Sequence, residues 1–185
     1  MIDIHDDVWT ISTEMRNDIK NHFKSSASTT SIVEIGAYKG YTTKFLSQIF
    51  HTVYAVDNHK KWLQENKNYN SDSTNIVFVE LNLYRDDWNI LQDPNVEVVF
   101  IDAVHSYYKC KSDTINSLKT FQNLKYIIFD DYGVFPEVKK VVDEFVENQT
   151  LSVVSFLGLT SVPTLSGVNV ENTHEGILCK VNQIP

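Results

Sequence analysis

Acidic residues follow two apolar runs whose composition is typical of buried strands. Asp102 ends the run that begins at Val96, and Asp130 and Asp131 end the run that begins at Tyr126. If the two runs are neighbouring parallel strands, their carboxyl ends meet at one edge of the sheet, where three carboxylates repel one another. A hard divalent cation with oxygen ligands, most plausibly Mg²⁺, would relieve that repulsion. The alternative interpretation is structural, with the acids serving only as strand ends and a helix cap.

A histidine accompanies the first of these acids, because His105 stands three residues after Asp102. An imidazole with an ordinary pKa of about 6.5 can accept a proton at neutral pH. A hydroxyl bound to a metal has a lowered pKa, so a neutral imidazole is a sufficient general base for it. We therefore expect His105 and Asp102 to be the catalytic pair. The alternative is a loop histidine with satisfied hydrogen bonds.

A second pattern, Glu34-x-Gly36-x-x-x-Gly40, lies where an apolar run enters a turn and a helix follows. Such a turn leaves backbone N–H groups free to bind a ligand. The spacing differs from the dinucleotide fingerprint G-x-G-x-x-G and suits an uncharged or zwitterionic group better than a pyrophosphate. Glu34 can organise the turn and contact an ammonium group through water. The alternative is a loop that needs its glycines for backbone reasons alone.

Asp57 strengthens the ligand interpretation. It ends the next apolar run, 21 residues after Gly36, where an acid can accept hydrogen bonds from a ribose diol. Its alternative role is to cap the helix that begins at Asn58 or His59. By position, Leu81 and Asn82 are candidates for contact with an adenine. Together these residues predict a cofactor that contains a nucleoside.

The elements that carry these residues alternate between strands and helices, which predicts an α/β fold with a doubly wound parallel sheet. We expect helices over 8–24, 41–51, 59–68, 85–92, 107–122 and 135–148. We expect strands over 31–36, 53–57, 75–80, 96–102, 126–130, 151–157 and 176–181. A loop with Pro163 and Gly167, and no helix, joins the last two strands, so the final strand should be antiparallel. The Asn/Ser-rich stretch 66–75 is predicted to be a surface loop.

Composition narrows the possible partners. The 185 residues carry a formal charge of −8, which disfavours a protein that binds nucleic acid electrostatically. No apolar run is long enough for a membrane span, and the N-terminus has no signal pattern. Two cysteines, Cys110 and Cys179, provide no disulfide framework. These observations predict a cytoplasmic protein that acts on a small molecule, with no membrane or nucleic-acid partner.

The residues around the glycine turn resemble a known cofactor loop. The stretch Glu34-Ile35-Gly36-Ala37-Tyr38-Lys39-Gly40-Tyr41-Thr42 closely resembles the S-adenosylmethionine-binding loop of class I methyltransferases, most of all the catechol O-methyltransferase type. The resemblance, which covers about residues 30–146, implies a seven-stranded sheet of order 3-2-1-4-5-7-6 with the last strand antiparallel. It implies cofactor contacts from Glu34, Gly36, Ala37, Tyr38, Gly40, Thr42, Asp57, Asn58, Asn82 and Asp102.

The strand ends extend the resemblance. In the catechol type an Asp at the Asp102 position binds Mg²⁺, and a Lys three positions later is the base, where this chain has His105. An Asp-Asn pair supplies further metal ligands where Asp130 and Asp131 stand. The strings Asp102-Ala-Val-His105-Ser-Tyr and Asp130-Asp131-Tyr132 are also similar to a family of sugar and small-molecule methyltransferases. The Pro-Gly-Gly turn usual before the fifth strand is missing.

The resemblance implies one methyltransferase domain over residues 1–185. It would comprise an N-terminal helical segment (1–30), a cofactor-binding core (31–150) and a C-terminal β-hairpin (151–185). The implied function is transfer of a methyl group from S-adenosylmethionine to a small-molecule or sugar hydroxyl, with Mg²⁺ on Asp102, Asp130 and Asp131. A metal-independent enzyme with His105 alone as base, and a non-catalytic cofactor-binding module, are the alternatives. The short N-terminal region offers little substrate cap, which a second subunit of a homodimer could supply.

Overall fold

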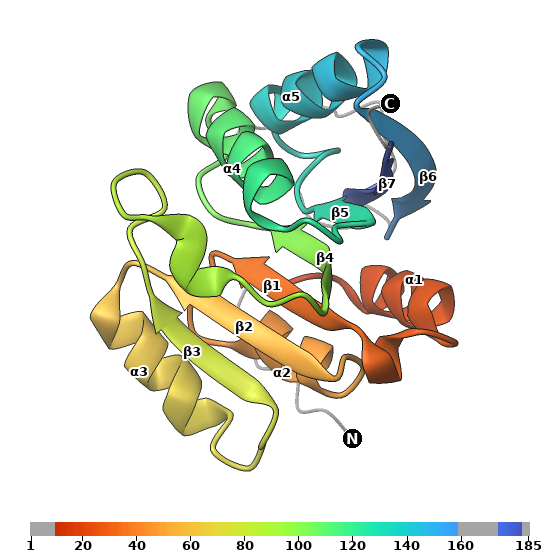
Figure 1. Cartoon of the computed structure of the whole chain (residues 1–185). Helices are drawn as coiled ribbons and strands as arrows, with labels where there is room; N and C mark the ends of the chain where they lie inside the picture. The colour runs from red at the N-terminus through yellow and green to blue at the C-terminus, as the bar shows by residue number, and fades with distance from the viewer. Residues whose placement is uncertain (1–9, 159–173, 183–185) are drawn as a thin grey trace.

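The sheet has the predicted order and strand directions. A computed structural model describes residues 10–158 and 174–182. These residues form a seven-stranded sheet of order β3-β2-β1-β4-β5-β7-β6 (Figure 1). Strands β1 to β5 are parallel, and β7 is antiparallel to both β5 and β6. Their bounds are β1 Ser31–Ile35, β2 Thr52–Asp57, β3 Ile76–Glu80, β4 Val96–Ile101, β5 Tyr126–Phe129, β6 Leu151–Leu157 and β7 Gly176–Val181.

Helices cover both faces of this sheet because side chains alternate along each central strand. Ile32 packs in one core with helices α1 and α2, while its neighbour Val33 packs in the other with α4 and α5. The helices are α1 Thr13–Phe23, α2 Tyr41–Ser47, α3 Lys60–Tyr69, α4 Tyr107–Thr120 and α5 Pro136–Glu147, with 3₁₀ helices η1 Ala27–Thr29 and η2 Trp88–Leu91. Helix α3 packs on β2 and β3. Within the described residues, no helix is long and apolar enough to cross a bilayer.

Several expected boundaries were wrong. Helix α1 begins at Thr13 because the Ser12 hydroxyl accepts the Met15 N–H at 3.1 Å and caps it; residues 8 and 9 of the expected helix lie outside the described residues. Helix α2 ends at Ser47 rather than residue 51. The expected helix over 85–92 is only the 3₁₀ turn η2. The loop with Pro163 and Gly167 also lies outside the described residues.

The stretch 66–75 is a surface loop only in its second part, because residues 71–75 are irregular and exposed or half-buried whereas residues 66–70 are not a loop. Residues 66–69 form the last turn of α3, and the side chains of Asn66 and Asn70 are completely buried. Composition failed here because asparagine is usually exposed, and only tertiary contacts can satisfy a buried amide.

The arrangement brings the candidate residues to one edge. Strands β1 and β4 are neighbours, and the Asp102 N–H donates to the Ile35 carbonyl at 2.9 Å where both strands end. The sheet order reverses between these two strands, which is where open α/β sheets bind their ligands.

Candidate active site

Two carboxylates and one imidazole meet where β4 and β5 end. His105 Nε2 lies 3.0 Å from Asp131 Oδ2 and 3.4 Å from Asp102 Oδ1. Between 21% and 25% of each of these three side chains is exposed, so solvent or a small ligand can reach them. The His105 ring is stacked on Phe135 with 4.3 Å between the ring centres. Loop residues thus hold the imidazole firmly between two acids.

Asp130 adjoins this group through a side-chain hydrogen bond with Asp102. Asp102, His105 and Asp131 each offer one potential ligand atom, and these three atoms lie within 4.8 Å of one another. Asp130 is not part of that set. Asp130 is buried, and its Oδ1 accepts the N–H of Asp131 at 2.9 Å. Asp131 has a left-handed backbone, with φ of 58°. The three atoms that lie together thus come from two aspartates and a histidine, with the Asp130 side chain hydrogen-bonded to Asp102 beside them, and a metal-ligand role of Asp130 stays a prediction.

The charged groups of this cluster change one another's pKa values. Burial raises the pKa of Asp102 to about 6, against the opposing hydrogen bond from His105. Burial alone would lower the pKa of His105, but its contacts with Asp102 and Asp131 outweigh burial and raise that pKa to about 9. The structure therefore favours an imidazolium at neutral pH, whereas an ordinary pKa near 6.5 was expected. Burial and the charges of Asp102 and Asp131 also raise the pKa of Asp130 well above its ordinary value.

A fourth acid, Glu175, lies beside this cluster. It stands just before β7, and its carboxylate accepts the Ser12 N–H at 3.0 and 3.2 Å. Burial raises the pKa of Glu175 although the hydrogen bonds from Ser12 oppose it, and the charges of Asp131 and Asp102 raise it further. Sequence reasoning missed this residue because it is distant along the chain and belongs to no motif.

The glycine turn packs directly against the end of β4. Gly36 has φ of 94°, and a Cβ added there would lie 2.1 Å from the Asp102 carbonyl oxygen. Tyr38 and Gly40 also have left-handed backbones, with φ of 42° and 92°. The Gly36 and Ala37 N–H groups donate to the Val56 carbonyl at 2.9 and 3.0 Å. Only a residue without a side chain fits at position 36, so the turn and the acid–histidine cluster are in contact.

Asp57 and Glu34 both bind this turn. Asp57 Oδ2 accepts the Tyr38 N–H at 2.9 Å, and Oδ1 accepts the His59 N–H at 2.7 Å. Asp57 is not the cap considered from the sequence, because helix α3 begins at Lys60 and His59 is its N-cap. Glu34 is fully buried and accepts the Thr43 hydroxyl at 2.5 Å. Burial raises the pKa of Glu34 well above its ordinary value.

A cavity adjoins the ends of β2 and β3. It measures about 310 Å³ and is lined by Asn58, Glu80, Leu81, Asn82, Arg85 and Asp86. Asn82 also accepts the Tyr84 N–H at 3.1 Å. Thr42, another predicted contact, is buried in the first turn of α2, with its hydroxyl 3.3 Å from that of Thr10. Two of the predicted cofactor residues, Asn58 and Asn82, therefore line the same cavity.

Comparison with known proteins identifies the family. The model of a family described as a methyltransferase domain matches residues 33–132, which is more than half of the chain. The chain belongs to this family. No curated protein sequence matches the methyltransferase chain.

Solved structures share the methyltransferase fold at low sequence identity. An O-methyltransferase from Bacillus cereus in complex with SAH is 14% identical, with a TM-score of 0.71, covering 95% of this chain and 84% of the other. An rRNA methylase from Streptococcus thermophilus is 14% identical, with a TM-score of 0.62, covering 94% and 100%. A tRNA methyltransferase from Aquifex aeolicus is 14% identical, with a TM-score of 0.65, covering 96% and 72%.

Proposed function

We propose that this methyltransferase uses S-adenosylmethionine to methylate a hydroxyl of a small molecule or sugar, with Mg²⁺ held by Asp102 and Asp131. The observation that carries the proposal is the contact between the Gly36 turn and Asp102, which puts the predicted cofactor loop directly beside the acid–histidine cluster. A methyl donor on the turn would thus face an acceptor at the cluster.

The described residues fit the cofactor. Asp57 ends β2 next to the cavity residue Asn58, and the cavity there offers polar groups from Asn58, Glu80 and Asn82 for the ribose and adenine. The Bacillus cereus relative is in complex with SAH. S-adenosylmethionine would supply an electrophilic methyl group. The chain's own part is to hold the donor and acceptor in line and to exclude competing orientations.

The donor set also fits a hard divalent cation. Carboxylate oxygens suit Mg²⁺, whereas an imidazole is a more usual ligand for zinc and other transition metals. This chemistry favours Asp102 and Asp131 as ligands and leaves His105 free to act as base. Mg²⁺ would neutralise the two carboxylates and lower the pKa of an acceptor hydroxyl. In this assignment Asp130 also orients Asp131, because Asp130 Oδ1 accepts the backbone N–H of Asp131. This contact adds to the metal-ligand role that the family resemblance implies for Asp130.

His105 would take the proton of the acceptor hydroxyl at Nε2, the atom that lies between the two carboxylates. Stacking on Phe135 fixes the ring plane. That role requires a neutral imidazole, and the carboxylates alone favour the protonated form. In this proposal His105 can act as a base only with the cation present, because the cation would offset the carboxylate charges of Asp102 and Asp131 that keep His105 protonated.

The charges around the site favour a small acceptor over a nucleic acid. Asp102, Asp130, Asp131 and Glu175 gather here, and the chain carries a net charge of −8. A phosphate backbone would meet repulsion from these groups, whereas nucleic-acid enzymes usually present a basic surface. The RNA methylases among the structural relatives share the fold only, so the acceptor class rests on this electrostatic reasoning.

A methyl-transfer assay tests the proposal. Wild type would be incubated with S-adenosylmethionine and a panel of sugars, phenols and RNA, with Mg²⁺ or with excess chelator. We expect methylation of a small hydroxyl compound that needs Mg²⁺ and falls about 100-fold or more in Asp131→Asn and His105→Ala. Glu137→Gln removes an exposed acid at the start of α5 and should have no effect. Full activity in chelator would favour a metal-independent enzyme, and methylation of RNA alone would overturn the acceptor class.

A further inference from the structure

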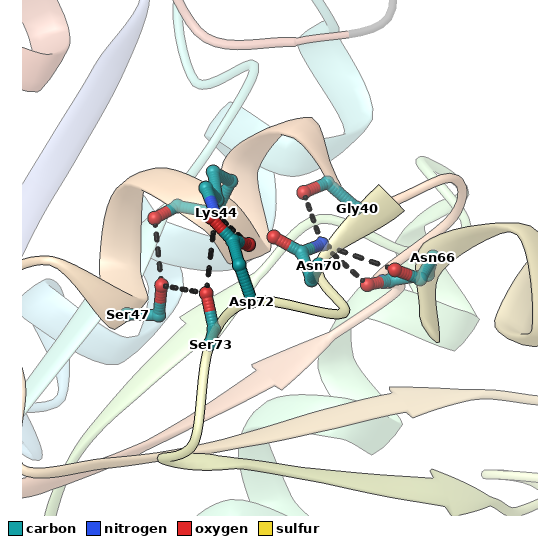
Figure 2. Close-up of polar contacts among 7 residues, drawn as sticks. All are labelled: Gly40, Lys44, Ser47, Asn66, Asn70, Asp72 and Ser73. Carbon is teal, nitrogen blue, oxygen red and sulfur yellow. Dashed lines mark hydrogen bonds and ion pairs between the residues drawn. The ribbon is translucent and has the colours of Figure 1, made fainter. Parts of the chain in front are cut away.

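Two fully buried asparagines on the last part of α3 bind the glycine turn. Asn66 Nδ2 donates to the Ala37 carbonyl at 3.1 Å and to the Thr43 hydroxyl at 2.9 Å. Asn70 Nδ2 donates to the Gly40 carbonyl at 3.0 Å and to Asn66 Oδ1 at 2.9 Å (Figure 2). The turn is thus held from outside its own sequence by two side-chain amides.

The hydrogen bonds fix how each amide is oriented. The Ala37 carbonyl can only accept a hydrogen bond, and the Thr43 hydroxyl between Asn66 and Glu34 joins the same network. Asn66 must therefore direct Nδ2 toward the turn and Oδ1 toward Asn70. A chain of side chains runs from β1 through α2 to α3, and each member sets the orientation of the next.

Asn70 contributes to the turn through its donor group, Nδ2. Its Oδ1 has no hydrogen-bond partner among the described residues, although the side chain is 1% exposed. A buried polar atom without a partner is costly, and here the compensation is Nδ2, which gives the Gly40 carbonyl a second donor beside the Lys44 N–H at 2.9 Å. A Cβ at Gly40 would lie 2.2 Å from Asn66 Oδ1, so the turn also packs closely against the pair.

The turn needs such support because one of its residues, Tyr38, has an unfavourable backbone conformation. Gly36, Tyr38 and Gly40 are all left-handed, and Tyr38 is a residue that rarely adopts that conformation. Gly40 is the N-cap of α2 and provides no side-chain hydrogen bond. Strained backbone persists when the surrounding structure holds it in place.

We propose that Asn66 and Asn70 are positioning residues that hold residues 36–43 in the conformation that binds the methyl donor. This inference rests on the proposed S-adenosylmethionine site. Neither amide needs to touch the cofactor, because both act through the Ala37 and Gly40 carbonyls and so determine how those peptide groups face.

The chain contains a matched control at the other end of α2. Asn75 Nδ2 donates to the Ser47 carbonyl at 2.9 Å and the Phe50 carbonyl at 3.0 Å. At the same end, Lys44 pairs with Asp72 and donates to Ser73 (Figure 2). Asn75→Ala thus removes two contacts to backbone carbonyls, as Asn70→Ala does with Gly40 and Asn66, but without touching residues 36–43.

The test compares Asn70→Ala with Asn75→Ala in three measurements on the full chain. These are the melting temperature, the dissociation constant for SAH by calorimetry, and hydrogen exchange of amides 36–43 without ligand. We expect both variants to melt earlier. Only Asn70→Ala should weaken SAH binding, by about tenfold or more, and speed exchange at 36–43, because the Gly40 carbonyl loses its side-chain donor and Asn66 Oδ1 loses the Asn70 amide. If Asn70→Ala does not fold, Asn70→Ser serves in its place.

Equal loss of SAH affinity in the two variants would overturn the inference, because it would show general destabilisation. Unchanged exchange at 36–43 in a folded Asn70 variant would also overturn it. If wild type does not bind SAH, the proposed function fails. The positioning role is then decided by exchange alone, and is supported only if residues 36–43 are less protected in Asn70→Ala than in Asn75→Ala.

Discussion

Asp113 provides a test of how this fold accommodates a buried charge. It lies on α4, is fully buried, and accepts the Tyr84 hydroxyl at 3.3 Å through Oδ2. Its Oδ1 has no hydrogen-bond partner within the described residues. Burial raises the pKa of Asp113 to about 7, although the Tyr84 hydrogen bond and the charge of Lys109 oppose the shift. Charging this carboxyl at neutral pH should therefore destabilise the fold.

The sign and size of this destabilisation follow from the difference in proton binding between the folded and unfolded states. Between the pKa of the unfolded chain, about 3.9, and the raised pKa of the folded chain, the folded state binds more protons. The free energy of unfolding therefore falls as pH rises through this window. With a folded pKa of about 7, the loss between about pH 5 and about pH 8 is about 2–3 kcal/mol. Asp113→Asn keeps an oxygen for Tyr84 but has no charge to bury, so it should escape this loss.

Urea unfolding across this pH range measures the effect. We expect the stability of Asp113→Asn relative to wild type to increase by about 2–3 kcal/mol from about pH 5 to about pH 8. Asp93→Asn is the control. Burial would raise the pKa of Asp93, but hydrogen bonds from Asn95 and Tyr54 lower it overall, so its titration lies below this range. A difference between Asp113→Asn and wild type that stays constant or shrinks as pH rises would refute the reasoning.

Three further substitutions test local features by thermal unfolding. Gly36→Ala places a Cβ on the Asp102 carbonyl and forces a left-handed alanine, so it should cost about 2–5 kcal/mol; a loss below about 1 kcal/mol would contradict the close packing of the turn. Gln149→Gly should stabilise by about 0.5–1 kcal/mol, because Gln149 is exposed with φ of 64° just after α5; no gain would count against that backbone conformation. Trp88→Phe removes the bond from Nε1 to the Leu83 carbonyl at 2.9 Å and should cost about 1–3 kcal/mol; a neutral result would argue against a buried indole.

The fold was predictable because its sequence signals are local and repeated. Each central strand is an apolar, β-branched run, and the helices between them show their own periodicity. The antiparallel direction of β7 was predicted because the sequence before it shows no helical pattern. Its place between β5 and β6, which the structure confirms, was implied by the family resemblance.

The site was only partly predictable because its details depend on backbone geometry and distant contacts. The sequence placed Asp130 and Asp131 together, but the left-handed φ of Asp131 brings that residue to His105 while Asp130 stays buried. The raised pKa of His105 results from two acids that share one nitrogen, which residue types do not reveal. Asn66 looked like a loop residue because its partners, Ala37 and Thr43, are distant in the chain.

The central claim is that the turn at residues 36–43 and Asp57 bind S-adenosylmethionine. Calorimetric titration of SAH into wild type and Asp57→Ala tests it most directly. We predict one site per chain and at least about tenfold weaker binding in Asp57→Ala, because that change removes the acceptor for the Tyr38 N–H and the carboxylate proposed to bind the ribose. No binding to folded wild type at millimolar SAH, or equal affinity in the two proteins, would contradict the account.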